Sequence, residues 1–227
     1  MQSNALLLAD PALYNEAMES VSLLDPVIVA FDRALRAVFF PAQARRPVPG
    51  SPDIPELSAP ERERAAALMR INHAGEIAAQ ALYHGQAFAA RSAGTQDLLL
   101  NAAQEETDHL AWCETRLAEL GARPSILNPL WYAGSFTIGV LAAALGDRAS
   151  LGFIAETERQ VEGHLGEHLD RLPAADARSR AILEAMRADE IAHGERARSA
   201  GGGLLPGPIR ALMRLTAGVM TGTAYWL

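Results

Sequence analysis

The sequence predicts an all-α protein built on a four-helix bundle. Ala and Leu dominate its apolar residues, and both favour helices. Long alternating runs of β-branched residues, which are typical of strands, are missing. Segments with apolar residues at helical spacing are separated by Gly and Pro. With 227 residues, 49% of them hydrophobic, the chain is long enough for one main core with appendages.

The first predicted element is an amphipathic helix over residues 26–40, with Asp25 as its cap and Pro26 in its first turn. Its apolar stripe contains Val27, Ile28, Phe31, Leu35 and Phe39. Residues 41–54 are rich in Pro and Arg, which is typical of a linker. We therefore expect residues 1–57 to form an N-terminal extension and residues 58–227 to form the main domain.

The main domain opens with a capping box, in which Ser58 and Glu61 satisfy the first turn of a helix that reaches about residue 90. Gly94 is expected to break this helix, and a second helix over residues 96–120 follows, which Gly121 ends. A short apolar helix follows over residues 129–145. Further helices are predicted over residues 147–172, where Pro173 stops the helix, and over residues 176–199 and 208–225.

The pattern Glu-x-x-His occurs twice in the chain, as Glu106 with His109 and as Glu190 with His193. Residues three apart share one face of a helix, so each pair is able to grip one ion. Ferritin-like sites for two metals combine two such pairs with a lone glutamate from each of two further helices. A single copy would most often be a pair of solvated side chains, whereas two copies favour one shared site.

The lone glutamates follow from hairpin geometry, since both arms of a hairpin rise equally per residue. Glu76 and Glu106 have their midpoint at Arg91, beside the predicted turn. Glu158 and Glu190 have theirs at Ala174, beside Pro173. The predicted ligands are therefore Glu76, Glu106, His109, Glu158, Glu190 and His193.

Glu158 is preferred within its helix because it lies in an apolar stripe with Ile154, Val161, Leu165 and Leu172. Glu156 and Glu162 are expected in solvent, although Glu162 is close enough to the edge to approach the site. His73 and His164 are candidates either for donors to a ligating carboxylate or for hydrogen-bonded structural residues. His84 and His168 are expected at the surface.

Four carboxylates and two imidazoles suit iron or manganese, and we predict two Fe ions with O2 as co-substrate. The single Cys113 supplies neither a thiolate cluster nor an internal disulfide. A net charge of -7 without any basic block argues against a nucleic-acid binder. The N-terminus has no secretory signal pattern, which favours an intracellular protein. No flavin or nicotinamide fingerprint is present, so electrons would come from the substrate or an external donor.

Two apolar segments bear on membranes. Residues 130–145 are too short for the roughly 20 residues that span a bilayer. Residues 208–225 place Ile209, Leu212, Met213, Thr216, Val219, Met220 and Thr223 on one face, with Arg210 and Arg214 available for lipid headgroups. This pattern is typical of peripheral membrane attachment, and equally of ordinary helix packing or a homo-oligomer contact.

The string Met69-Arg-Ile-Asn-His-Ala-Gly-Glu-Ile77, both Glu-x-x-His motifs, and Glu158 followed by His164 resemble the demethoxyubiquinone hydroxylase family of ubiquinone biosynthesis. The resemblance runs from about Glu61 to the C-terminus. It implies a ferritin-like di-iron monooxygenase with the same six ligands, which hydroxylates a polyprenylated benzoquinol at the cytoplasmic face of the inner membrane. Many members have Tyr after the histidine that matches His164, where this chain has Leu165.

Three alternatives stand beside this interpretation. A ferritin-class protein would bind or oxidise iron without an organic substrate, and a manganese catalase would use the same ligand types. A helical scaffold would bind no metal at all. Symmetric assembly into a cage would favour the first, and failure to bind iron would favour the last.

Overall fold

The computed structural model describes residues 24–52 and 56–227, and these residues form helices and connecting loops. The helices are α2 (Asp25–Phe39), α3 (Ala59–Ala89), α4 (Ala93–Glu119), α5 (Asn128–Ala144), α6 (Asp147–Arg171), α7 (Ala177–Ser199) and α8 (Gly207–Ala224). The predicted all-α fold is confirmed, and each predicted helix in the described ranges is present with its ends shifted by a few residues. Residues 53–55, at the end of the predicted linker, lie outside the described residues.

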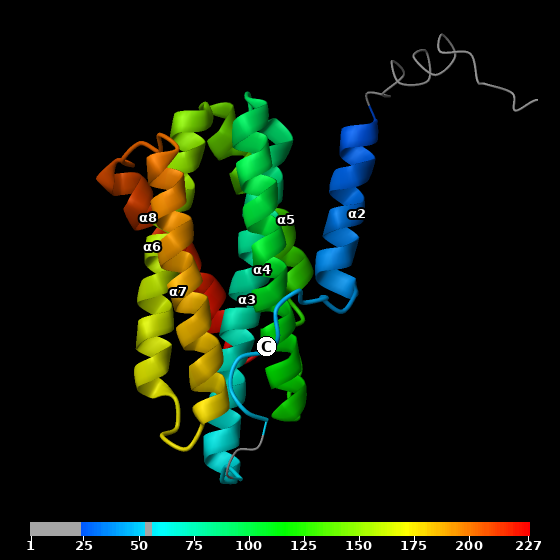
Figure 1. Ribbon diagram of the computed structural model, residues 1–227, viewed down its shortest axis with the longest axis vertical. Helices are drawn as coiled ribbons and strands as arrows, with labels where there is room; N and C mark the ends of the chain where they lie inside the picture. The colour runs from blue at the N-terminus through cyan, green and yellow to red at the C-terminus, as the bar shows by residue number, and fades with distance from the viewer. Residues whose placement is uncertain (1–23, 53–55) are drawn as a thin grey trace, which may run out of the picture.

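Four long helices make the bundle shown in Figure 1. Helices α3 and α4 form one hairpin and α6 and α7 form the other, with α4 packed against α7 and α3 against α6. Helix α5 packs along α3 and carries the chain from one hairpin to the other. Helix α8 lies against α3 and α6, while α2 lies beside α3 and α5.

The helix ends agree with most of the sequence signals. Ser58 and Glu61 form the predicted capping box, since the backbone N–H of Ser58 donates to Glu61 Oε2 at 3.0 Å. Two details of the prediction were wrong. Gly94 does not break a helix, because Ser92 caps α4 and Gly94 lies in its first turn. Asp25 is the first residue of α2 rather than its cap, which is Leu24.

The two hairpins are tied together at both ends of the bundle. At one end Asp147, which opens α6, accepts hydrogen bonds from the backbone N–H groups of Arg91 at 3.0 Å and Ser92 at 3.1 Å. At the other end Arg116 of α4 donates to Asp176, the cap of α7, at 2.9 Å. Both members of this ion pair are buried, so the hairpins cannot slide past each other without exposing an unpaired charge.

Two apolar clusters fill the bundle on either side of a polar middle layer. One contains Leu68, Met69, Leu117, Leu165 and Met186. The other contains Leu82, Leu99, Ile154 and Ala197. In each helix the polar residues of the middle layer fall between the residues of these two clusters, so the site is walled by apolar packing along the bundle axis.

Helix α5 approaches α3 closely because two glycines meet at their crossing. A Cβ added to Gly139 of α5 would collide with the carbonyl oxygen of Leu82, and one added to Gly85 of α3 would collide with the carbonyl oxygen of Phe136. Both obstacles are backbone atoms, which cannot rotate away. The position of α5 over α3 therefore depends on these two glycines.

We expect Gly139→Ala to lower the free energy of unfolding by about 1–3 kcal/mol, because the new methyl group forces the two helices apart. Gly134→Ala, in the same helix, is the matched control, since a Cβ there meets nothing within 4 Å. The control should be neutral or more stable by about 1 kcal/mol, as Ala is the better helix former. Urea denaturation of both variants measures the difference, and equal effects would contradict close packing at Gly139.

Candidate metal centre

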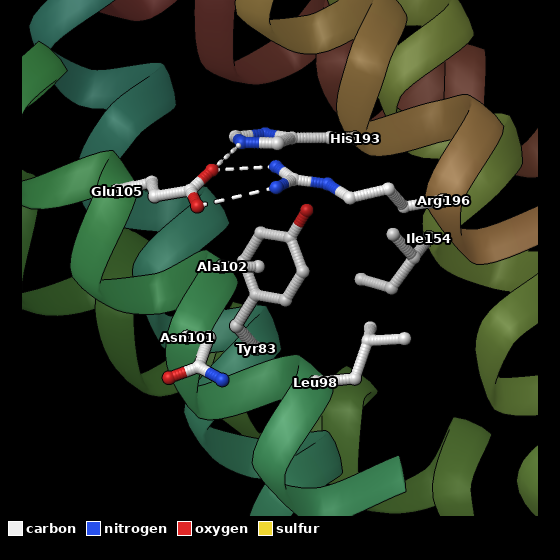
Figure 2. Close-up of a pocket in the computed structure, with 8 residues that line it drawn as sticks. All are labelled: Tyr83, Leu98, Asn101, Ala102, Glu105, Ile154, His193 and Arg196. Atoms are coloured by element: carbon white, nitrogen blue, oxygen red, sulfur yellow. Dashed lines mark hydrogen bonds and ion pairs between the residues drawn. The ribbon is translucent and has the colours of Figure 1, made fainter. Parts of the chain in front are cut away.

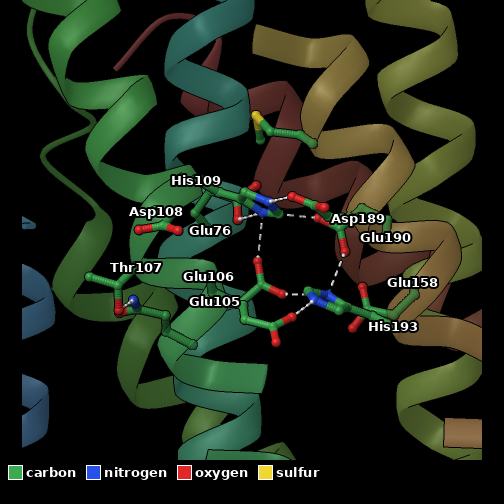
Figure 3. A network of polar contacts seen from close by, with 12 residues as sticks. Glu76, Glu105, Glu106, Thr107, Asp108, His109, Glu158, Asp189, Glu190 and His193 are labelled. Atoms are coloured by element: carbon green, nitrogen blue, oxygen red, sulfur yellow. Dashed lines mark hydrogen bonds and ion pairs between the residues drawn. The ribbon is translucent and has the colours of Figure 1, made fainter. Parts of the chain in front are cut away.

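The middle layer of the bundle brings all six residues predicted as ligands into one buried cluster, drawn in Figure 3. Its ligand atoms form two overlapping groups, each with all atoms within 4.8 Å of one another. One group contains Glu76, Glu106, His109 and Glu190, and the other contains Glu106, Glu158, Glu190 and His193. Glu106 and Glu190 belong to both groups, whereas each histidine and each lone glutamate belongs to one.

Hairpin geometry explains why these residues meet. The turn between α3 and α4 spans residues 90–92 and contains Arg91, the midpoint of Glu76 and Glu106. The turn between α6 and α7 spans residues 172–176 and contains Ala174, the midpoint of Glu158 and Glu190. Both hairpins therefore hold a lone glutamate level with a Glu-x-x-His pair, as the spacing predicts.

In both histidine rings Nδ1 faces the cluster and Nε2 faces outward. Nδ1 of His109 lies 2.9 Å from Glu106 and 3.3 Å from Glu190, while Nδ1 of His193 lies 2.9 Å from Glu106 and 3.4 Å from Glu190. Each Nε2 points outward to a further carboxylate. His109 Nε2 is 2.9 Å from Asp189, and His193 Nε2 is 2.7 Å from Glu105.

This orientation suits metal binding by both rings. An Nε2–H group that donates to a carboxylate leaves the Nδ1 lone pair free to face the cluster. The outer carboxylates are held in turn by arginines. Arg46 pairs with Asp189 at 2.7 Å, and Arg196 pairs with Glu105.

The electrostatics of the cluster favour bound cations. Burial raises the pKa of Glu76 and of Glu158 well above the usual range, and the neighbouring carboxylates of Glu106 and Glu190 add to the rise. Burial lowers the pKa of His193, but Glu106 and Glu190 outweigh it and raise this pKa to about 11. Carboxylates packed this closely resist ionising together, so a position between them attracts positive charge.

Several buried atoms of the cluster also lack a hydrogen-bond partner within the described residues. They are Oε2 of Glu76, Oε1 of Glu106, Oε2 of Glu190 and Nδ1 of His193. The last lies 2.9 Å from Oε1 of Glu106, but the two atoms do not meet in hydrogen-bond geometry. Leaving such atoms unsatisfied costs about 1–3 kcal/mol each, and more when they are charged. Oxygen and imidazole donors aimed at a common centre fit a pair of iron or manganese ions, so the residues present match the predicted di-metal site.

On one side of the cluster lies a small cavity of about 160 Å³, shown in Figure 2. Its walls include Tyr83, Ala102, Glu105, His193 and Arg196. The buried hydroxyl of Tyr83 donates to Oε1 of Glu158, which orients that carboxylate. Burial and the Glu158 charge raise the pKa of Tyr83, so its hydroxyl stays protonated as a donor.

A larger and mainly apolar cavity of about 430 Å³ lies between α3, α5, α6 and α8. Glu76 contributes to its wall, so the cavity reaches the metal centre. Its apolar lining includes Ile71, Leu82, Ile138, Phe153, Leu165, Met213 and Met220. Polar side chains share this lining, among them Asn72, Trp131, Gln160, His164 and His168.

The remaining histidines are distributed differently from the prediction. His168 is buried rather than at the surface, with Nδ1 at 2.8 Å from Oδ1 of Asn72. His84 is half-buried, with Nδ1 at 2.9 Å from the hydroxyl of Tyr132. His73 is buried, with Nδ1 at 3.2 Å from the side-chain nitrogen of Asn128. His164 is half-buried in the wall of the larger cavity.

The two rejected glutamates of α6 also differ from each other. Glu156 was expected in solvent but is only 8% exposed, and it accepts hydrogen bonds from Arg159 and from Gln160 at 2.8 Å. Glu162 is partly exposed and pairs with Arg187 at 3.0 Å, away from the cluster. Burial alone therefore does not select Glu158, whereas convergence with the other carboxylates does.

Sequence reasoning missed the outer residues of the site. Glu105 and Asp189 each directly precede the glutamate of a Glu-x-x-His motif, and this shared position was a usable signal. Arg196 lies one turn beyond His193 and was also within reach of helical spacing. Arg46 lies far away in the chain and carried no such signal.

Comparison with known proteins agrees with this geometry. Residues 63–224 match the family described as ubiquinone biosynthesis protein COQ7. Relatives named 3-demethoxyubiquinol 3-hydroxylase include proteins of Nitrosomonas eutropha, 56% identical over 90% of this chain and 99% of the relative, and of Cupriavidus necator, 59% identical over 89% and 99%. A relative of that name in Bordetella petrii is 56% identical over 90% of this chain and 92% of its own length. The chain therefore belongs to the ubiquinone biosynthesis protein COQ7 family, whose fold is ferritin-like.

Proposed function

We propose that this chain is a 3-demethoxyubiquinol 3-hydroxylase, a monooxygenase that adds one oxygen atom of O2 to the ring of a polyprenylated quinol. The observation that carries the proposal is the contact between the buried Glu and His cluster and the apolar cavity, which share Glu76. Relatives that cover nearly the whole chain carry the same activity in their names. The six cluster residues are proposed as ligands of two iron ions.

The larger cavity suits a substituted quinol ring. Its volume of about 430 Å³ lies within the range of roughly 300–1,000 Å³ that small-molecule sites occupy. The buried indole N–H of Trp131 has no hydrogen-bond partner within the described residues, so it is available to a ring oxygen. Met213, Ala217 and Met220 of α8 border the same cavity and offer apolar contact to a polyprenyl tail.

The residues of the chain divide the chemistry between them. The iron ions, when bound, supply oxygen activation and electron transfer. Glu106 and Glu190 would hold both ions, and the Nε2 contacts of both histidines direct Nδ1 toward the cluster, where a bound ion would replace its proton. The apolar lining keeps water from the ring, which favours transfer of one oxygen atom to carbon while the other leaves as water. The electrons come from the quinol or from an external reductant.

A ferritin-class iron store is less well supported than the hydroxylase. Storage or oxidation of iron alone requires no apolar cavity beside the ligands, and the relatives are named for a hydroxylation. The same two observations disfavour a manganese catalase, whose substrate is a small polar molecule.

We expect Glu106→Ala and Glu190→Ala each to abolish binding of both iron ions, because each carboxylate lies in both ligand groups. Glu76→Ala should weaken mainly one ion, since Glu76 lies in one group. Elemental analysis after anaerobic loading with ferrous iron measures the metal bound per chain. Glu162→Ala, on α6 near Glu158, is the control and should keep both ions. Full iron content in Glu106→Ala would contradict the assignment.

We expect Gly75→Leu to reduce hydroxylation at least about tenfold while iron content is kept. Gly75 lies in the cavity wall beside Glu76, and a Cβ there meets nothing within 4 Å, so the new side chain enters the cavity without breaking the helix. Gly163→Leu, on the exposed side of α6, is the matched control and should keep activity. Lipid-quinone analysis of cells with each variant as their sole copy measures the demethoxy precursor. No accumulation with Gly75→Leu would remove this cavity as the substrate site.

We also propose that the protein binds the membrane surface at its cytoplasmic side, peripherally, through α8 and its neighbours. Leu212, Leu215 and Val219 of α8 are at least half exposed, as are Leu130 and Leu141 of α5. Both helices border the cavity, so attachment through them would bring the cavity close to a lipid-soluble substrate. Among the described residues, no helix combines the length and the apolar content needed to cross a bilayer.

Flotation with vesicles of phosphatidylethanolamine and phosphatidylglycerol tests this attachment. We expect the pair Leu212→Glu and Leu215→Glu to lose most of the bound fraction, because both side chains would have to leave the lipid. The pair Ala174→Glu and Ala175→Glu, in the exposed turn between α6 and α7, adds the same charge and should float normally. Equal flotation of both double variants would contradict a role for α8.

A further inference from the structure

Outside the cluster, two series of side-chain contacts link α4 and α7. On α4, Glu105 precedes the shared Glu106 and contacts His193 of α7. On α7, Asp189 precedes the shared Glu190 and contacts His109 of α4. Each carboxylate therefore holds the histidine of the other helix, as Figure 3 shows.

The two series of contacts end on arginines from different parts of the protein. The contacts of Glu105 end on Arg196, which belongs to α7 of the bundle itself. The side chain of Glu105 is 43% exposed and that of Arg196 is 51% exposed. The contacts of Asp189 end on Arg46, which lies in residues 41–52, the segment that connects α2 to the bundle. The predicted N-terminal extension thus reaches the metal centre.

Arg46 is held by several independent contacts to α4. Its Nε donates to Asp108, a side chain only 6% exposed, at 2.7 Å, and its guanidinium lies 4.6 Å from the ring centroid of Trp112. The preceding backbone is fixed as well, since the N–H of Arg45 donates to Asp108 at 2.6 Å. From this position the remaining arm of the guanidinium reaches Asp189 on α7 at 2.7 Å.

We propose that Arg46 is a positioning residue of the metal centre, which orients His109 by holding Asp189 in place. The inference rests on the proposed di-iron function. A guanidinium presents its donors in a rigid fork, so it bridges Asp108 of α4 and Asp189 of α7 at once. Asp189 is thereby kept at the distance from which it accepts the Nε2–H of His109. The ring then presents Nδ1 to the ion that Glu76 also faces.

Arg196 serves the other histidine in the same way, so the two arginines act on different ions. Loss of Arg46 should weaken binding of the ion at His109 and Glu76. Loss of Arg196 should instead weaken binding of the ion at His193 and Glu158. Replacing partners of this kind typically lowers metal affinity about 10–100-fold. This selectivity separates a positioning role from a general loss of stability, which would weaken both ions alike.

The test uses the full chain loaded anaerobically with ferrous iron enriched in the Mössbauer isotope, with iron content and Mössbauer spectra as readouts. We expect Arg46→Met to lower the affinity for one of two ions at least about tenfold and to alter one of the two iron signals. Arg196→Met should alter the other signal. Arg45→Met is the matched control, because Arg45 is exposed and contacts Asp108 through its backbone, and both signals should stay unchanged.

Arg46→Lys covers the case in which Arg46→Met does not fold, as judged by circular dichroism. Lysine keeps the charge but cannot bridge two carboxylates with a rigid fork, so it should give partial rescue at the same ion. Two ions bound with wild-type affinity and unchanged signals in the folded Arg46 variant would overturn the inference while leaving the di-iron proposal intact. A wild-type chain that binds no iron would overturn both.

Discussion

Four carboxylates buried together in the middle of the bundle are the constraint on which the rest of the structure depends. Glu76, Glu106, Glu158 and Glu190 are each at most 2% exposed. A buried charge without a partner costs several kcal/mol, and two histidines offset at most two of the four carboxylates, so all four ionise together only when cations bind. The arrangement therefore favours cation binding. Residues around it have to hold the carboxylates in place against their mutual repulsion.

The bundle meets this demand with contacts at several distances from the site. Asp147 and the Arg116–Asp176 pair tie the hairpins together at opposite ends, which fixes the level at which their ligands meet. Apolar clusters above and below the site prevent water from relieving the repulsion. Glu105 and Asp189 then set the two imidazole rings. The geometry of the six-residue cluster thus depends on side chains outside it.

The sequence predicted the six-residue cluster because it depends on regular helices, whose rise per residue is the same in both arms of a hairpin. It failed where burial depends on a second element. Glu156 looked solvated because periodicity within α6 does not reveal that α8 packs over it, where Gln160 contacts the backbone of Arg210. His168 is buried because Asn72 of α3 accepts from it. The contact of Arg46 with Asp189 could not be predicted for the same reason, because residues 41–52 pass over α4 without a regular sequence repeat.

The surroundings of the site make its two ends unequal. Glu76 faces a cavity of about 430 Å³ lined by apolar side chains, whereas His193 and Tyr83 face one of about 160 Å³ beside an exposed ion pair. Of these two cavities only the first is large enough for a substituted quinol ring, and the second has room for molecules of the size of water or O2. Under the proposed activity, the organic substrate meets the ion at Glu76 and His109. That is the ion whose histidine Arg46 orients through Asp189, so the N-terminal segment acts on the end of the site where the ring is oxidised.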